Sequence, residues 1–422
     1  MGTVRMSEKE RRRLEVLSRV RDGDLTLVKG AELMGVSYRQ AKRVFALYQT
    51  HGDEALTHGL RGKASNHATE PTRKARILSL CEGRYADFGP TLAAEYLEAE
   101  YGEVVAVETL RRWFIEAKLW KPRRRRWTTQ RQWRPRKEYR GELVQMDGSH
   151  HDWFEGRRDW AVLMVMIDDA TNTVFARFYE AETTGAAMRT FRRYVQLYGL
   201  PRALYVDRDS IYRTTRRASV DEQLAGEPPQ TQFGTAMRQL GVEIKLAASP
   251  QAKGRVEREN GVLQDRLVKA LRLRGLSTLA AANDFLDADF LPKLNDRFAV
   301  PPRRSCDLHR PLDPRVDLRR VLGFRETRTV RNDRTIQWRH RWFQLDKTSG
   351  VRPGRTVEVF EDLEGGVHVR FRDRDIPAQE LLERPAPRPR VVKTPPGQRK
   401  PWKPAADHPW KQSYKARYSG TG

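Results

Sequence analysis

The chain has 422 residues, 38% of them hydrophobic, which is enough for about three domains with real cores and excludes a globally disordered protein. Lysine and arginine number 80 against 55 acidic residues, which gives a net charge of +25. Because the basic residues are clustered, binding to a polyanion is favoured over the alternative that the charge only aids solubility. Cys81 and Cys306 lie far apart, which excludes a disulfide framework and a zinc knuckle. The chain starts with charged residues and contains no apolar run long enough to cross a membrane, so we expect a cytoplasmic protein without membrane contact.

Residues 1–60 are predicted to form a helix-turn-helix domain. Ala31 on one helix, Gly35 in a tight turn and Ser37 at the cap of the next helix are typical of this motif. An ordinary three-helix packing unit carries the same signals, and the basic charge favours the DNA-binding interpretation. The helix after Ser37 would present side chains that suit base edges and phosphates, namely Tyr38, Arg39, Gln40, Lys42 and Arg43.

Residues 68–119 show helical periodicity again and are predicted to form a second helix-turn-helix domain. Its candidate DNA contacts are Thr109, Arg111 and Arg112. Residues 120–140 are rich in arginine and tryptophan and predict an extended basic linker. Its candidate phosphate contacts are Arg123, Arg124, Arg125 and Arg126, and the alternative is a solvated tether whose tryptophans pack on a neighbouring domain.

Residues 141–290 predict an α/β domain that carries the chemistry. Three hairpin-linked strands, then a helix, a strand, a helix, a strand and a long helix are expected in this order, which is that of a ribonuclease-H-like fold. Asp147 and Asp207 each end a strand, and Glu257 lies near the start of the long helix. Three carboxylates brought together in this way would suit a divalent metal such as Mg²⁺.

Several neighbouring residues compete with these three carboxylates. Asp209 shares a strand face with Asp207, whereas Glu259 points about 200° away from Glu257 around a helix, so only one glutamate can face the site. Asp168 and Asp169 are expected to form a turn, and His150 and His151 to support the site or face DNA. Lys253 and Arg255 are candidate phosphate contacts, and the polar residues 213–232 are predicted to be an insertion, to which no role is assigned.

Three motifs resemble the DDE triad of the retroviral-integrase superfamily: QMDGSHHDWF around Asp147, YVDRDS around Asp207 and SPQAKGRVE ending at Glu257. With its tandem helix-turn-helix units and basic C-terminus, the chain resembles more narrowly the ISNCY-type insertion-sequence transposases of bacteria. The resemblance favours Asp207 over Asp209 and Glu257 over Glu259.

This resemblance implies a mechanism and partners. Two Mg²⁺ (or Mn²⁺) ions would be held with Asp147 bridging them and with Asp207 and Glu257 on one ion each. Water would cleave double-stranded DNA at the terminal inverted repeats, and the freed 3′-hydroxyl would attack target DNA without a covalent protein intermediate. Because two ends must meet, we expect at least a homodimer. A DNA-binding regulator with an inactive core and a nuclease that cuts without joining are the alternatives.

The C-terminal third predicts three further segments. Residues 291–324 are rich in proline and arginine and are expected to be a connector. Residues 325–384 show five short strand patterns and predict a small SH3-like β-barrel for DNA binding or subunit contact. Residues 385–422 have the composition of a disordered basic tail.

Overall fold

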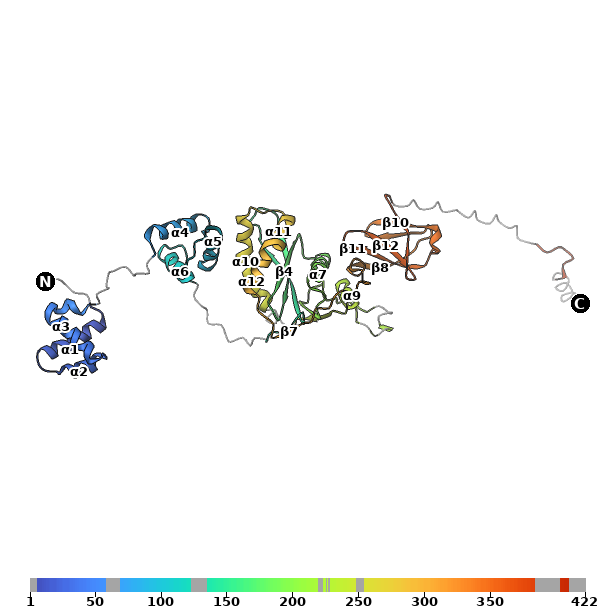
Figure 1. Cartoon of the computed structure of the whole chain (residues 1–422). Coiled ribbons are helices and arrows are strands. Elements are labelled where there is room, and N and C mark those ends of the chain that lie inside the picture. Colours follow the sequence, from blue (N-terminus) through green and yellow to red (C-terminus); the bar gives the residue numbers. More distant parts are fainter. Residues whose placement is uncertain are drawn as a thin grey trace, which may run out of the picture. The chain divides into compact units, whose positions relative to one another are not determined.

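The computed structural model describes residues 6–57, 69–122, 135–218, 223, 224, 226, 228–247, 254–383 and 403–409 (Figure 1). The chain divides into two compact units, Met1–Thr128 and Thr129–Gly422. None of the helices in the described ranges combines the length and the apolar character needed to span a bilayer. The predicted basic tail lies outside the described residues except for residues 403–409.

The first helical domain has the predicted helix-turn-helix geometry. Gly35 ends one helix in the left-handed region at φ 64°, and Ser37 caps the next helix by accepting a 3.3 Å hydrogen bond from the Gln40 amide. Leu17 and Tyr48 lie in its core. The elements are α1 (Glu8–Arg21), α2 (Leu27–Met34), α3 (Tyr38–His51) and the 3₁₀ turn η1 (Gly52–Leu56).

The second helical domain packs three helices around an aromatic core. The rings of Tyr85, Phe88 and Tyr96 pack in tilted and edge-to-face arrangements with centroids 4.9 to 5.8 Å apart. Gly102 ends the second of its helices in the left-handed region, at φ 66°. The helices are α4 (Pro71–Gly83), α5 (Pro90–Tyr101) and α6 (Val107–Glu116).

The α/β domain is built on one mixed sheet with the strand order β4-β3-β2-β5-β6. β2, β3 and β4 pair antiparallel, whereas β5 pairs parallel with β2 and with β6. This is the ribonuclease-H-like arrangement that the order of elements predicts. The strands are β2 (Val144–His151), β3 (Ala161–Asp168), β4 (Val174–Tyr179), β5 (Ala203–Val206) and β6 (Glu243–Leu246).

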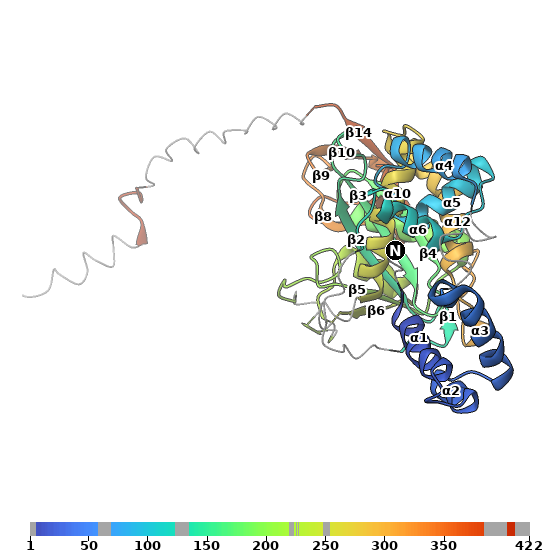
Figure 2. The same ribbon diagram turned by 90° about the vertical axis from the view of Figure 1, so that its left-hand side faces the viewer.

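Helices cover both faces of this sheet, so that every residue of β3 is buried. Figure 1 shows α7 and α9 on one side of β4 and α10 to α12 on the other, and Figure 2 looks onto the side of α10. The helices are α7 (Thr184–Tyr198), α9 (Gln232–Gln239), α10 (Gly254–Leu273), α11 (Leu279–Phe285), the π-helical turn η3 (Leu286–Phe290) and α12 (Leu291–Phe298).

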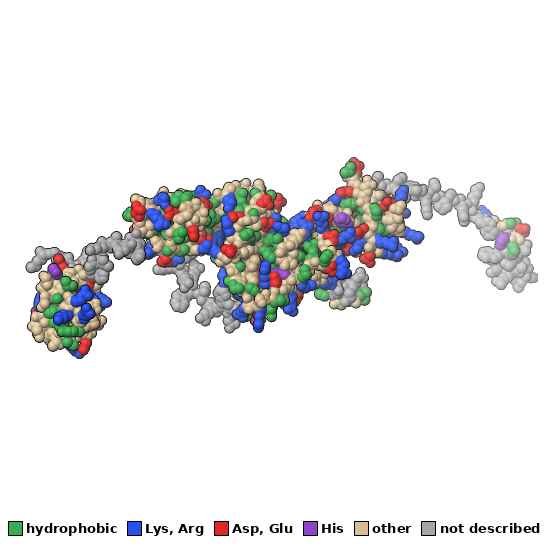
Figure 3. Space-filling view, viewed as in Figure 1, with side chains coloured by type: hydrophobic (Ala, Val, Ile, Leu, Met, Phe, Trp, Pro, Cys, Tyr) green, Lys and Arg blue, Asp and Glu red, His purple; other side chains and the backbone are tan. Residues whose placement is uncertain are grey.

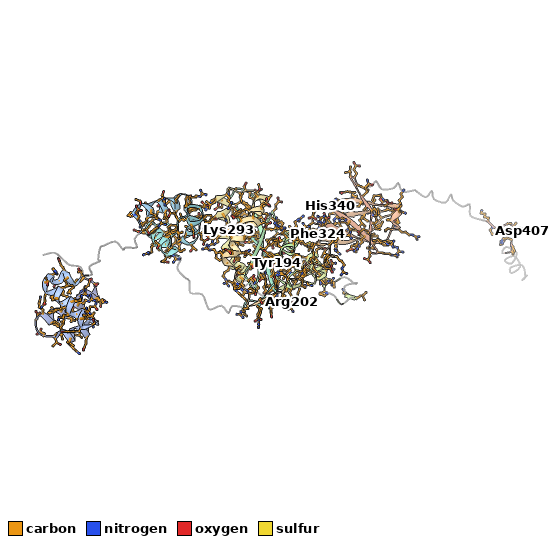
Figure 4. The ribbon with its side chains drawn as sticks, in the orientation of Figure 1. Tyr194, Arg202, Lys293, Phe324, His340 and Asp407 are labelled. Carbon is orange, nitrogen blue, oxygen red and sulfur yellow. The ribbon has the colours of Figure 1, made fainter. Side chains whose placement is uncertain are left out.

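Residues 291–322 belong to the α/β domain, which corrects the prediction of a connector. Leu291 and Leu294 on α12 join the main core, and β7 (Arg304–Asp307) pairs parallel with β1 (Tyr139–Arg140). Tyr194, in the middle of this domain in Figure 4, has its hydroxyl 2.8 Å from His309 Nε2. The proline and arginine content predicts a connecting loop for this segment. It folds as part of the α/β domain instead, because its leucines are buried in the core of that domain.

The C-terminal residues fold into a small β domain, as predicted, but they do not form a closed barrel. Within the described residues, strands pair into separate sheets of orders β14-β10-β9 and β13-β12-β11-β8 over a core that includes Ile336, Trp338 and Val359. Lys and Arg side chains are frequent on the face seen in Figure 3. The elements are α13 (Leu318–Val321), β8 (Gly323–Thr329), β9 (Thr335–Trp338), β10 (Arg341–Leu345), η4 (Lys347–Ser349), β11 (Thr356–Asp362), β12 (Val367–Phe371), β13 (Arg374–Ile376) and β14 (Ala378–Leu381).

The β domain is bonded directly to the α/β domain. Gln232 at the start of α9 exchanges two hydrogen bonds with the backbone of Arg325, at 2.8 and 3.1 Å. Arg192 on α7 forms a 2.7 Å ion pair with Glu364. Figure 4 labels Phe324 at this junction.

Candidate active site

Asp147 and Asp207 lie on neighbouring parallel strands. Gln145 on β2 is paired with Tyr205 on β5, so the same register extended by two residues brings Asp147 opposite Asp207, which directly follows β5. Neighbouring strands are about 4.8 Å apart, and residues two apart share a face, so both carboxylates are on one side of the sheet. Both side chains are half-buried.

Helix α10 brings a third carboxylate to the same side. Asn260 Nδ2 donates to Asp147 Oδ2 at 3.3 Å, and Gln264 Nε2 donates to Ser149 Oγ at 3.4 Å. Residues three, four and seven apart share a helix face. Glu257, three residues before Asn260 and exposed, is therefore on the face of α10 that is directed toward Asp147.

Glu259 occupies the opposite, internal face of α10. It is 6% exposed, and Asn172 Nδ2 donates to its Oε2 at 3.4 Å. Burial raises the pKa of Glu259. The two alternatives that the sequence leaves for the third carboxylate thus have different environments, and only Glu257 shares a face with Asn260.

A further carboxylate, which the sequence motifs did not indicate, lies against β2 at Gly148, on the face of the strand opposite to that of Asp147. Glu182 precedes α7, and its Oε2 is 2.8 Å from His150 Nε2. Burial raises the pKa of Glu182, His150 lowers it, and the charges of Asp147 and Asp207 raise it further. His150 is on the face of β2 opposite to that of Asp147, so its role, in supporting the site or in facing DNA, stays a prediction.

The carboxylates match a divalent metal in ligand type, since Mg²⁺ prefers oxygen ligands. As the side chains stand, no three His, Cys, Asp or Glu residues of the described ranges are gathered closely enough to enclose an ion. The strand register and the face of α10 nevertheless direct Asp147, Asp207 and Glu257 to one place.

The helix α3 presents a polar surface that suits DNA. Tyr38, Arg39, Gln40, Lys42 and Arg43 are all exposed, whereas Ala41 and Tyr48 on the same helix are buried. The residues predicted to contact DNA therefore lie on the outer face of the second helix of the motif.

Comparisons with known proteins agree with this architecture. Residues 12–64 match a family model described as a helix-turn-helix domain. A protein of Sinorhizobium fredii (strain NBRC 101917 / NGR234) named "Putative transposase y4bF" is 40% identical over 381 residues, which cover 89% of this chain and 82% of that protein. The chain belongs to the transposase family. The transposase for insertion sequence IS1202 of Streptococcus pneumoniae is 26% identical over 95% of this chain and 93% of that protein.

Solved structures similar to this transposase include retroviral integrases. The HTLV-2 integrase catalytic core domain in complex with magnesium is 18% identical, with a TM-score of 0.25, over 35% of this chain and 83% of that one. A chain of the simian T-cell lymphotropic virus intasome in complex with PP2A regulatory subunit B56 gamma is 14% identical, with a TM-score of 0.31, over 72% of this chain and 95% of that one.

The other predicted DNA contacts of the transposase differ in their surroundings. On α6, Arg112 is exposed, whereas Thr109 is half-buried and Arg111 forms an ion pair with Glu108. Arg123 to Arg126 and Lys253 lie outside the described residues. The DNA contacts of α6 and of these residues stay predictions.

Arg255 is directed into the protein. Its guanidinium forms an ion pair with Asp169, whose side chain is fully buried, and only 15% of the Arg255 side chain is exposed. Asp169 also accepts from the Lys137 amide at 2.9 Å and from Gln145 Nε2 at 2.7 Å. An internal partner for Arg255 is thus observed, and a phosphate contact stays a prediction.

Asp168 has the turn-forming role that the sequence predicts for it. Its Oδ1 accepts from the amide and the hydroxyl of Thr171, each at 2.8 Å, and its Oδ2 accepts from the Gly141 amide at 2.7 Å. These bonds occupy both carboxylate oxygens at the turn between β3 and β4. Neither Asp168 nor Asp169 competes with Asp147 for the site.

Proposed function

We propose that this transposase is a DDE enzyme that binds the terminal inverted repeats of its insertion sequence, cleaves DNA there and joins the freed end to target DNA. Asp147, Asp207 and Glu257 are its catalytic residues. The observation that carries the proposal is the contact between Asn260 and Asp147, because it fixes the face of α10 on which Glu257 lies.

Asp147, Asp207 and Glu257 would together hold the two divalent ions, Mg²⁺ or Mn²⁺, that the proposed reaction needs. When bound, such a pair activates the attacking oxygen and stabilises the leaving oxygen of an in-line displacement. Asn260 keeps the Asp147 carboxylate oriented through its 3.3 Å hydrogen bond. The attack of water and then of the 3′-hydroxyl needs no nucleophile from the protein.

The helix-turn-helix residues of α3 would hold the terminal repeat while the α/β domain acts on it. The exposed Arg39, Gln40 and Arg43 have the donors and acceptors that read base edges and contact phosphates. We further propose that the active complex is at least a homodimer, because two transposon ends must be brought to one target.

A strand-transfer assay with Mg²⁺, a labelled terminal repeat and a plasmid target tests this function. The proposal predicts cleavage and joining by the wild-type protein, and loss of both with unchanged repeat binding in Asp147→Asn and Asp207→Asn. Cleavage without joining would favour a nuclease, and binding without cleavage would favour a DNA-binding regulator. Either of these results would contradict the proposal.

A further inference from the structure

The first helical domain carries a groove to which the proposed function gives no role. The groove measures about 540 Å³ and lies between the start of α1 and the end of α2, two helices that run side by side (Figure 1). This volume is typical of a cleft that takes a ligand. The residues that line it are Glu8, Lys9, Arg12, Arg13, Glu32, Leu33, Met34 and Gly35.

Three cations form the α1 side of this groove. Arg12 and Arg13 follow Lys9 by three and four residues, so the three side chains share one face of the helix. Lys9 and Arg12 are exposed, and none of the three forms an ion pair with another described residue. Cations of this kind are available to an anion from outside the protein.

The acidic side chains near these cations do not cancel their charge. Glu32 forms a 2.7 Å ion pair with Lys29. Glu10 is buried and accepts a 2.8 Å hydrogen bond from the Ser7 amide at the cap of α1. Glu8 is in the first turn of α1, where the helix dipole favours a negative charge. The groove therefore has an excess of positive charge.

The opposite wall of the groove leads directly into α3. Gly35, the turn residue of the helix-turn-helix motif, lines the groove, and Ser37 caps α3 two residues later. The first residues of α3, Tyr38 and Arg39, are exposed. A recognition helix contacts base edges with its N-terminal residues, so the phosphates that flank those bases would lie beside the cations of α1.

We propose that Lys9, Arg12 and Arg13 form a phosphate-binding groove that holds the DNA backbone next to the first turn of α3. This inference rests on the DNA-binding function proposed above for α3. It gives the two helices different tasks: α3 reads the bases, whereas α1 contacts the backbone and so fixes the position of α3 on the DNA.

Binding of the full-length protein to the terminal repeat and to random DNA, followed by fluorescence anisotropy at several salt concentrations, tests the inference. The double substitution Lys9→Ala, Arg12→Ala is expected to weaken binding to both DNAs equally, because phosphate contacts carry no sequence information. The slope of log affinity against log salt concentration should become shallower by about 1.8, since each phosphate contact contributes about 0.9. The melting temperature should not change, because both side chains are exposed.

Arg11→Ala is the matched control. Arg11 is an exposed arginine between the two substituted positions, but it points about 200° away from Lys9 around α1 and does not line the groove. Its substitution is expected to leave the slope close to that of wild type. An unchanged slope in the double variant, or a loss of affinity confined to the terminal repeat, would overturn this inference and leave the proposed function intact. Equal binding of both DNAs by the wild-type protein would overturn both.

Discussion

Glu257 and Glu259 are two residues apart on one helix and meet opposite surroundings. Glu257 is exposed on the face that carries Asn260, whereas Glu259 is buried beside Asn172 and one of its oxygens accepts no hydrogen bond from the described residues. An ionised carboxylate at position 259 destabilises the folded state, because burial removes the charge from water. The structure therefore predicts different consequences for the same substitution at the two positions.

The stability of the protein should depend on pH through Glu259. Burial raises the pKa of Glu259 above its ordinary value of 4.5, so the folded state binds this proton more tightly than the unfolded state. The contribution of Glu259 to the free energy of unfolding is fully present below its ordinary pKa of 4.5. This contribution is lost as the pH rises through the raised pKa of Glu259 in the folded state. Glu259→Gln removes this loss, so its melting temperature should increase relative to wild type as the pH rises from 4.5 through the raised pKa of Glu259. A difference that stays constant over this range would contradict the assignment.

Individual site residues could be predicted where local sequence decides their position. Asp207 directly follows its apolar strand, as predicted, whereas Asp147 lies within β2, which continues to His151 instead of ending at Asp147. The parallel pairing of the two strands brings both aspartates together. The contact of Glu182 with Gly148, on the other face of β2, could not be predicted, because it depends on the path of the chain between β4 and α7. Asn260 could have been found, since it is three residues after Glu257 and so shares its helix face.

At the scale of elements, the start of α10 is anchored to the turn between β3 and β4. Arg255 pairs with the buried Asp169, and Glu259 is bonded by Asn172. Both partners lie within residues 168–172, and together they hold the first turns of α10. Since Glu257 lies between the two anchors, they also determine where its carboxylate is presented.

Arg255→Ala should therefore destabilise the α/β domain. Removing one partner of a buried ion pair leaves the other charge uncompensated and costs about 3 kcal/mol. Chemical denaturation of the variant measures this loss, and Arg258→Ala is the control because Arg258 is exposed on the same helix. If Arg255 acted only as a phosphate contact, its substitution would weaken DNA binding and leave the unfolding midpoint unchanged.

The helix α3 should determine which DNA sequence is bound. Arg39→Ala should reduce the preference for the terminal repeat over random DNA by about tenfold, because a base contact is worth about 1–3 kcal/mol. Arg19→Ala, an exposed arginine on α1, is a charge-matched control. Fluorescence anisotropy with both DNAs would measure the ratio of the affinity for the terminal repeat to the affinity for random DNA. An equal ratio for the two variants would show that Arg39 of α3 does not recognise the base sequence.

Helices and strands with a strong local hydrophobic pattern agree well with prediction. The pairing of strands into sheets, however, does not follow from the hydrophobic pattern alone. The apolar run of β3 and the alternating strands of the C-terminal domain were visible in the sequence. Whether β9 and β10 close a barrel with β11 or pair into a separate sheet depends on long-range contacts. Here β10 pairs with both β9 and β14. The leucines of α12 were likewise hidden in a segment rich in proline and arginine.

At the scale of the whole molecule, the net charge of +25 predicts DNA binding that depends strongly on salt. Each phosphate neutralised adds about −0.9 to the slope of log affinity against log salt concentration. Residues 385–422 contain nine lysines and arginines, so a chain that ends at Arg384 should show a shallower slope. Titrations at several salt concentrations measure it, and an unchanged slope would show that these residues do not contact DNA.

The central claim is that the face of α10 selects Glu257 as the third catalytic carboxylate, and cleavage of a labelled terminal repeat by two matched variants tests it most directly. Glu257→Gln should abolish cleavage while repeat binding is retained, and Glu259→Gln should cleave at a rate close to that of wild type. Full activity in Glu257→Gln together with loss of activity in Glu259→Gln would contradict the account.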